Sequence, residues 1–384
     1  MNTWLIRRTL GAAVTLLVAV TLVFFLMRLT PGDPLSRLGE ERPLPPEAVA
    51  ALKARYGLDQ PLPRQYAAFV GGLLRGDLGA SIEHNGRPVT ALLAERLPPT
   101  LLLGGTALLL NFSFGIWLGV WQAARHGSRA DRAATLVTLV AYAMPSFWLG
   151  IVLIWAFATE LRWFPVGFMR TPWLSADAGW WARLTDLGWH LVLPALTLSV
   201  STMAATVRFQ RAAMIEALGS DAVRTARSKG LPERRVRWGH AWRNALGPVL
   251  ALFGLWLPLL VAGSVFVEQV FSWPGLGSLV AEAIGSRDYP VVMGATLLVA
   301  TAVVAGNLLA DLLHRWLDPR LRAPCSARHS GSGREGGSGW CCWPRCCSSC
   351  SSRPRCSRPR TSSRTSSRAG SSHPAPAPCS APTT

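Results

Sequence analysis

The chain has 384 residues, of which 50% are hydrophobic and only 16% are charged, whereas about a quarter of the residues of a soluble globular protein are charged. This composition is a poor fit to an ordinary soluble enzyme. The formal net charge is +18, and residues 324–384 carry +8 of it together with all eight cysteines. Residues 1–323 therefore carry +10 and no cysteine, which excludes a disulfide-stapled secreted fold and a thiolate metal site in that part.

Six apolar runs are long enough to cross a bilayer, whose hydrocarbon core of about 30 Å requires roughly 20 helical residues. Lipid offers no hydrogen-bond partner to an open backbone, so we expect each run to be a helix. The first run could instead be a secretory signal, because Arg7 and Arg8 precede it, but it is too long and no small-x-small cleavage site follows. We predict an all-α polytopic membrane protein with six transmembrane helices. The runs are residues 10–29, 100–121, 134–158, 189–207, 247–267 and 290–310.

The basic residues of the connecting segments predict the orientation of these helices. Seventeen Lys and Arg residues fall on the side of the N-terminus, and nine of them lie between Arg208 and Arg243. On the other side, residues 31–99 hold eight basic and eight acidic residues, and residues 159–188 hold three of each. The excess of positive charge then places both termini in the cytoplasm.

The segment between the first two runs begins with the turn cluster Pro31-Gly32-Asp33-Pro34. We expect three short amphipathic helices in it, which Gly57, Gly76 and Pro98 end. Their expected bounds are Glu47 to Tyr56, Arg64 to Leu74 and Val89 to Leu97. The segment is small for an independent domain and is better suited to capping the outer mouth of the bundle. We therefore group it with the first helix as residues 1–99, ahead of a five-helix core over residues 100–323.

Residues 208–246 form the other long connection, and they are too polar to cross a membrane. The pattern predicts a helix from Phe209 to Lys229, which Gly230 ends, with Pro232 close behind. Basic residues near the C-terminal end suit the helix dipole, so a purely structural surface helix is one interpretation. A helix that docks on a partner is the other.

Three prolines and one carboxylate bear on the interior of the bundle. Pro145, Pro194 and Pro258 each remove a backbone donor and are expected to kink their helices, as suits a bundle that opens on alternate sides. Glu268 follows the fifth run, where we expect an interfacial carboxylate that reaches water. The alternative is that Glu268 and Pro258 line a translocation path.

The chain holds no pattern for catalysis or for ATP binding. Its two lysines, Lys53 and Lys229, both lack the surroundings of a phosphate-binding loop. No nucleophile elbow and no His-Glu-x-x-His zinc helix occurs. We expect no catalytic residue, no metal site and no cofactor on this chain. The spans also hold few ionisable residues, which argues against a stand-alone secondary transporter or channel.

The connection 208–246 resembles the cytoplasmic loop of ABC importer permeases, through the segments Val223 to Leu231 and His240 to Pro248. In that family a short coupling helix ends near a loop glycine and sits in a groove on the ATPase. The family pattern is Glu-Ala-Ala, three residues and Gly, and its places are occupied here by Arg224-Thr225-Ala226 and Gly230. The resemblance implies that the ATPase-coupling residues are Arg224, Thr225, Ala226, Lys229 and Gly230.

Further motifs extend the resemblance over residues 1 to about 323. In this order and spacing they are similar to those of the first permease subunit of dipeptide, oligopeptide and nickel importers. They are Pro31-Gly32-Asp33-Pro34, Tyr56-Gly57-Leu58-Asp59, Gly76-Asp77-Leu78-Gly79, Leu97-Pro98-Pro99-Thr100, Pro145-Ser146-Phe147-Trp148, Phe271 to Gly277, Arg287-Asp288-Tyr289-Pro290 and Asp318-Pro319-Arg320-Leu321-Arg322. The loop Phe271 to Gly277 is then either part of the surface that receives a binding protein or a turn-rich cap packed on its own helices.

The resemblance implies a bacterial inner-membrane subunit that carries dipeptides or oligopeptides, with nickel as an alternative substrate. It implies four further partners: a second homologous permease, two cytoplasmic ATPases and an extracytoplasmic substrate-binding protein. ATP and Mg²⁺ would bind the ATPases and not this chain. Membrane lipid would surround the helices, and no nucleic acid is expected as a partner.

Residues 324–384 depart from the family, whose members end soon after the Asp-Pro-Arg-x-Arg segment. The tail is rich in Ser, Arg, Pro and Cys and has almost no aliphatic residues, so it cannot bury a core and is expected to be disordered. Its cysteines lack the paired Cys-x2-Cys blocks of a structural zinc site. We expect the tail to result from a shifted reading frame, and the alternative is a genuine basic tail that binds lipid or nucleic acid.

Overall fold

The computed structural model describes residues 2–29, 45–175, 177–256 and 264–317. All of them belong to the first of two units of the chain, Met1–Pro324, and the second unit is Cys325–Thr384. The described residues form helices and turns without a strand, and one isolated bridge pairs Ala80 with Pro88. The predicted all-α class is confirmed. The prediction of a disordered tail falls outside the described residues.

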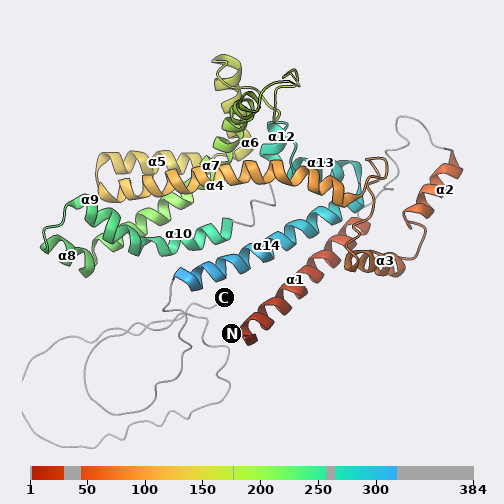
Figure 1. Cartoon of the computed structure of the whole chain (residues 1–384), viewed down its shortest axis with the longest axis horizontal. Helices are drawn as coiled ribbons and strands as arrows, with labels where there is room; N and C mark the ends of the chain where they lie inside the picture. Colours follow the sequence, from red (N-terminus) through yellow and green to blue (C-terminus); the bar gives the residue numbers. More distant parts are fainter. Residues whose placement is uncertain (1, 30–44, 176, 257–263, 318–384) are drawn as a thin grey trace, which may run out of the picture. The chain divides into compact units, whose positions relative to one another are not determined.

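Figure 1 shows the helices in chain order. They are α1 (Asn2–Leu29), α2 (Pro46–Arg55), α3 (Leu62–Leu74), α4 (Val89–Ala124), α5 (Arg129–Ala143), α6 (Ser146–Leu153), the π-helix η2 (Ile154–Glu160), α7 (Trp180–Leu218), α8 (Asp221–Ser228), α9 (Glu233–Arg235), the π-helix η3 (Val236–Ala241), α10 (Trp242–Trp256), α12 (Val265–Val270), α13 (Leu276–Ser286) and α14 (Tyr289–Leu317). Within these residues, α1, α4, α7 and α14 are long and apolar enough to cross a membrane. They contain the first, second, fourth and sixth predicted runs.

The prediction of one kinked helix over residues 134–158 is wrong. α5 ends at Ala143, α6 begins at Ser146, and the two helices meet at an angle of 104°. The cause is Pro145, whose ring disfavours a helical backbone at the residue before it. Met144 accordingly adopts the extended conformation, with φ −78° and ψ 128°. Counted as one broken span, this pair brings the candidate spans among the described residues to five.

The fifth predicted run, residues 247–267, is described only in part. α10 reaches Trp256 and α12 begins at Val265. The residues between them include Pro258, so its predicted kink lies outside the described residues. Pro194 lies inside α7, which continues through it to Leu218.

The structure confirms two of the three short helices expected between the first spans, α2 and α3, with Gly57 and Gly76 at positive φ just after them. The third expectation, a helix that Pro98 ends, is wrong, because α4 runs from Val89 through Pro98 and Pro99 to Ala124. A proline fits a helix where neighbouring helices hold the chain on both sides of it. Here Pro99 and the adjacent Thr100 are both buried.

The single helix predicted from Phe209 to Lys229 is two helices. α7 ends at Leu218, Gly219 and Ser220 follow, and α8 begins at Asp221. Ser220 has an extended backbone with φ −71° and ψ 155°, which is the conformation of a residue at a helix N-terminus. The hydroxyl of Ser220 also donates to the carbonyl of Ala217 at 2.6 Å, so the break is fixed by local hydrogen bonding.

The long helices pack on one another through α7 and α14. α4 lies along α7, and α5 and α10 also pack on α7, whereas α14 packs on both α1 and α10 (Figure 1). Much of the apolar surface remains exposed, including Leu136, Val137 and Val140 on α5 and Leu17 and Leu22 on α1. Apolar faces of this extent are expected of helices that contact lipid or partner chains.

Candidate functional site

α8 has one face that packs against the chain and one face that is open. Val223 is fully buried and Ala226 is 4% exposed, whereas Arg224, Thr225 and Lys229 are exposed. The buried positions are three apart and therefore lie on one side of the helix. Of the five predicted coupling residues, Ala226 thus faces the chain's own core, and the other four are exposed.

A cluster of small apolar side chains supports α8. α4 contributes Val120 and Ala123, α7 contributes Met214 and Ala217, and residues after α9 complete the cluster: Val236, Ala241 and Ala245. Val223 and Ala226 pack into this cluster. α8 therefore packs against the C-terminal ends of α4 and α7. A displacement of α8 by a partner would move both of these ends.

Gly230 ends α8 as predicted, and the geometry explains why a glycine is there. Its φ is +72°, a conformation that L-residues with a side chain seldom adopt. The Leu231 amide donates to the Ala226 carbonyl at 3.4 Å, and the Gly230 amide donates to the Arg227 carbonyl at 2.9 Å. These two bonds form a Schellman motif, and Leu231 packs on the same cluster as Ala226.

Arg227 closes the segment that follows α8. Its guanidinium donates to the Glu233 carboxylate, with Nε 2.8 Å from Oε1 and Nη2 3.4 Å from Oε2. This hydrogen bond holds the pKa of Glu233 below its ordinary value. Both side chains are about half exposed, so the pair orders the surface and contributes little to global stability.

A buried ion pair beside this cluster was not predicted from the sequence. Asp131 is 2% exposed, and it accepts two hydrogen bonds from Arg211, at 2.8 Å from Nε and 2.7 Å from Nη2. The Gly127 amide donates to the same carboxylate at 3.0 Å. The pair therefore fastens the first turn of α5 to α7, about two turns before the end of α7. The signal in the sequence was Ser128 three residues before Asp131, since the Ser128 hydroxyl caps α5 by accepting from the Asp131 amide.

Glu268 lies in a different cluster, on α12 beside the turn that leads to α13. The expectation that its carboxylate reaches water is wrong, because Glu268 is fully buried. The Thr100 hydroxyl donates to Oε1 at 3.1 Å, and the Ser278 amide donates to Oε2 at 2.9 Å. The donors to the carboxylate thus come from α4 and from the first turn of α13, which a sequence pattern of local turns could not reveal.

Two glycines and a tryptophan make the burial of Glu268 possible. A Cβ atom at Gly275 would lie 2.5 Å from the Glu268 carboxylate and from the Thr100 hydroxyl, and one at Gly277 would lie 2.9 Å from Oε2 of Glu268. The Trp273 indole, also fully buried, donates to the Pro99 carbonyl at 2.9 Å. The loop after Phe271 therefore packs on its own helices, as one of the two interpretations expected. Pro258, the other path candidate, lies outside the described residues.

Within the described ranges, no three His, Cys, Asp or Glu side chains are grouped so that they could hold a metal ion. The arrangement consists of an exposed polar face of α8 whose opposite face packs on the ends of α4 and α7. Such a face can bind another protein and transmit its movement.

Two family models match the chain. Residues 115–323 match the family model described as binding-protein-dependent transport system inner membrane component, and residues 1–104 match the N-terminal model of the same kind of membrane component. Neither match extends into residues 324–384.

Curated relatives match this chain over almost their whole length. The oligopeptide transport system permease protein AppB of Bacillus subtilis is 40% identical over 321 residues, which are 84% of this chain and 99% of the relative. The di/tripeptide transport system permease protein DppB of Pseudomonas aeruginosa is 41% identical over 332 residues, which are 83% of this chain and 98% of the relative. The glutathione transport system permease protein GsiC of Pectobacterium atrosepticum is 37% identical over 322 residues, 84% of this chain and 99% of the relative. The chain belongs to the family of binding-protein-dependent transport system inner membrane components.

Proposed function

We propose that this chain is one of two permease subunits that together form the path of an ABC importer for dipeptides or oligopeptides. In this proposal α8 is the coupling helix, and ATP is hydrolysed on separate subunits. The observation that carries the proposal is the division of α8 into a buried apolar face and an exposed polar face that includes Arg224, Thr225 and Lys229. An amphipathic helix mounted in this way suits a groove on a soluble partner.

The proposed orientation places both termini and α8 in the cytoplasm. It rests on the nine basic residues between Arg208 and Arg243, against equal numbers of acidic and basic residues on the other side. The turn between α12 and α13 then faces the opposite side, where a substrate-binding protein would deliver the substrate. The full assembly would contain this chain, a second permease, two ATPases and the binding protein.

Transport would follow from alternating access. Closure of the ATPases would displace α8, and the cluster around Val223 would pass this movement to α4 and α7. The ion pair of Asp131 with Arg211 would carry α5 along, because it joins the first turn of α5 to α7. The break at Pro145 would let α5 move relative to α6.

Peptides are the proposed substrates because the relatives named above include oligopeptide, di/tripeptide and glutathione permeases. The cognate binding protein offers the direct measurement. We expect a dipeptide or oligopeptide to raise its unfolding temperature, whereas stabilisation by a nickel complex alone would contradict the peptide assignment.

The coupling role of α8 is tested by Gly230→Val. The substitution forces a β-branched residue into a left-handed backbone, but no atom lies within 4 Å of the new Cβ, so the disturbance stays at the end of α8. We expect uptake of labelled dipeptide to fall roughly tenfold while the purified complex still hydrolyses ATP.

Gly76→Val is the matched control. Gly76 also has a positive φ, +77°, and open space around its Cβ position, but it follows α3 and not α8. We expect uptake close to that of the unmodified protein. Unchanged uptake in Gly230→Val, or equal losses in the two variants, would refute the coupling role.

A further inference from the structure

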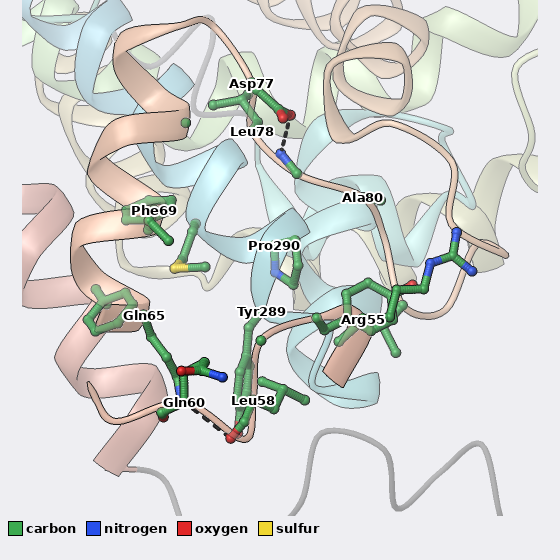
Figure 2. A pocket seen from close by; sticks show the side chains of 18 of the residues that line it. Arg55, Leu58, Gln60, Gln65, Phe69, Asp77, Leu78, Ala80, Tyr289 and Pro290 are labelled. Atoms are coloured by element: carbon green, nitrogen blue, oxygen red, sulfur yellow. Dashed lines mark hydrogen bonds between the residues drawn. The ribbon is translucent and has the colours of Figure 1, made fainter. Parts of the chain in front are cut away.

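A cavity of about 340 Å³ lies at the end of α1 that is opposite to its N-terminus. Figure 2 shows it between α3, which contributes Gln65 and Phe69, the segment from Asp77 to Ala80, and the first residues of α14, Tyr289 and Pro290. Its size falls in the range of small-molecule sites. None of the roles proposed above uses it.

The walls of the cavity are fixed by packing and by a buried carboxylate. Phe24 of α1 is 1% exposed and stacks on Phe69, with ring centroids 5.8 Å apart. Asp288, which is 1% exposed and precedes Tyr289, accepts hydrogen bonds from the Ser81 hydroxyl and from the Ile82 amide at 3.1 Å. The cavity is therefore preformed and does not depend on a ligand to organise it.

The charge of the cavity is positive. Arg28, Arg55 and Arg64 line it, against a single lining carboxylate, that of Asp77. One oxygen of Asp77 is already used, because it accepts from the Gly79 amide at 2.8 Å (Figure 2). The surplus of guanidinium groups favours an anionic ligand, and arginine is well suited to phosphate oxygens.

Among the described residues, the contacts that hold the Arg28 guanidinium are two aromatic rings. Its guanidinium carbon lies 5.6 Å from the centre of the Phe24 ring and 5.4 Å from that of Tyr289. No hydrogen-bond or ion-pair partner of Arg28 lies among the described residues. The two rings fix the guanidinium, and its N–H donors remain available for a ligand.

The cavity also presents an acceptor. Gln65 donates through Nε2 to the Gln60 carbonyl at 2.7 Å, but its buried Oε1 has no donor within the part of the chain that the structure describes. A ligand that bears a hydroxyl group near its anion would supply that donor. This combination of an anion and a hydroxyl group beside an apolar wall is the chemistry of an anionic phospholipid whose headgroup carries a hydroxyl group, such as phosphatidylglycerol.

The position of Arg28 along α1 brings it to the level of lipid headgroups. The candidate span Arg8–Leu29 has 22 residues, which at 1.5 Å per residue extend about 33 Å, slightly more than the hydrocarbon core. Arg28 is its penultimate residue and therefore lies at the membrane surface. The exposed apolar side chains of Leu22 and Phe25 on α1 mark the same helix as one that can contact lipid.

We propose that this cavity binds the headgroup of an anionic phospholipid. The phosphate accepts hydrogen bonds from Arg28 and Arg64, a headgroup hydroxyl donates to Oε1 of Gln65, and the first acyl carbons pack against Phe69 and Met293. Bound there, the lipid fills the space between α1, α3 and α14 and holds α1 to the rest of the subunit.

The test uses the full chain, purified in detergent with whatever partners accompany it, and three probes. They are phosphatidylglycerol with eight-carbon chains, phosphatidylcholine of the same length, and inorganic phosphate, each titrated while bound ligand is counted by native mass spectrometry. We expect phosphatidylglycerol to bind about tenfold more tightly than phosphatidylcholine. Arg28→Gln and Arg64→Gln should each weaken its binding about tenfold, as the loss of a charge-assisted hydrogen bond does.

Two further variants complete the test. Arg28→Lys keeps the charge and should retain part of the affinity, and Arg132→Gln removes an equal charge from an exposed position on α5 and should bind as the unmodified chain does. Arg64 is exposed, so its substitution leaves the fold intact even if Arg28→Gln fails to insert. The proposal is overturned if Arg64→Gln binds phosphatidylglycerol as tightly as the unmodified chain, or if inorganic phosphate binds as tightly as the lipid.

Discussion

The α8 segment and the turn between α12 and α13 differ in which of their side chains are buried. In α8 the buried residues are apolar, Val223 and Ala226, and the polar residues point outward. At the turn the polar side chains of Glu268 on α12 and Thr100 on α4 are buried, and the Thr100 hydroxyl donates to the Glu268 carboxylate. A turn whose buried polar groups find partners within this chain needs no partner chain for its stability, whereas a helix that leaves its polar face open presents a surface. Substitutions should therefore damage folding in the turn and damage association in α8.

The largest loss of stability is expected from Gly275→Ala. The new Cβ would lie 2.5 Å from the Glu268 carboxylate carbon and from the Thr100 hydroxyl, so both buried groups must move. Overpacking combined with a broken buried hydrogen bond should cost about 3 kcal/mol. The measurement is thermal unfolding of the purified subunit, together with the amount inserted in membranes.

Gly285→Ala is the control for that prediction. Gly285 lies on α13, in the same part of the fold, but nothing stands within 4 Å of its Cβ position. Alanine there should be neutral or slightly stabilising, because it favours the helix. Equal unfolding temperatures of the two alanine variants would show that the turn can rearrange to accept the new Cβ atom at Gly275.

Asp131→Asn should cause the next largest loss of stability. The amide keeps the shape of the carboxylate, but it cannot accept both hydrogen bonds of Arg211 together with that of the Gly127 amide. Leaving the partly buried guanidinium without its charge partner should cost about 2 kcal/mol. Peptide uptake should fall more than the amount of folded subunit does, since α5 then loses one of its connections to α7.

Asp221→Asn is the comparison for this ion pair. Asp221 lies 3.6 Å from Arg224, but the side chain of Asp221 is 97% exposed. The unfolding temperature should stay unchanged, because an exposed pair contributes little. If Asp221→Asn lowers the unfolding temperature as much as Asp131→Asn does, the burial of Asp131 does not explain the stability that its ion pair contributes.

Glu268→Gln should destabilise the turn less than Gly275→Ala does. Glutamine offers one acceptor oxygen where the carboxylate offers two, so either the Thr100 hydroxyl or the Ser278 amide loses its partner. We expect a loss of about 1 to 2 kcal/mol, and no loss from Glu282→Gln, an exposed position on α13. Uptake should follow the amount of folded subunit; a larger loss of uptake would support a path-lining role of Glu268.

The long apolar helices were predictable because their signal is local. A run of about 20 apolar residues can be satisfied only as a helix in lipid, and α1, α4, α7 and α14 contain four such runs. The glycines that end short helices were predictable for the same reason, since the positive φ at Gly57 and Gly230 is a local requirement.

Two errors, the helix end expected at Pro98 and the exposure expected of Glu268, arose where residues far apart in the sequence decide the local structure. α4 continues through Pro98 and Pro99 while the Trp273 indole bonds to the Pro99 carbonyl from 174 residues away. Glu268 is buried because Thr100 bonds to it across 168 residues. The Asp131 pair with Arg211 likewise spans 80 residues. No pattern of spacing within one segment contains these contacts.

The smallest effect on stability is expected from Arg224→Glu, on the open face of α8. The Arg224 side chain is 77% exposed, and its only ion pair within the described residues is the exposed one with Asp221. Reversing its charge should therefore leave the unfolding temperature unchanged. Arg75→Glu, an exposed position just after α3, reverses the same charge away from α8 and serves as control.

Uptake should nevertheless separate these two variants. If the open face of α8 binds the ATPase, a reversed charge in that contact weakens assembly, so less ATPase should co-purify with Arg224→Glu and peptide uptake should fall severalfold. Raising the salt concentration should narrow the difference from the unmodified chain, because screening weakens both the native attraction and the introduced repulsion. A normal yield of ATPase and normal uptake would mean that the exposed polar face of α8 is only a solvated surface.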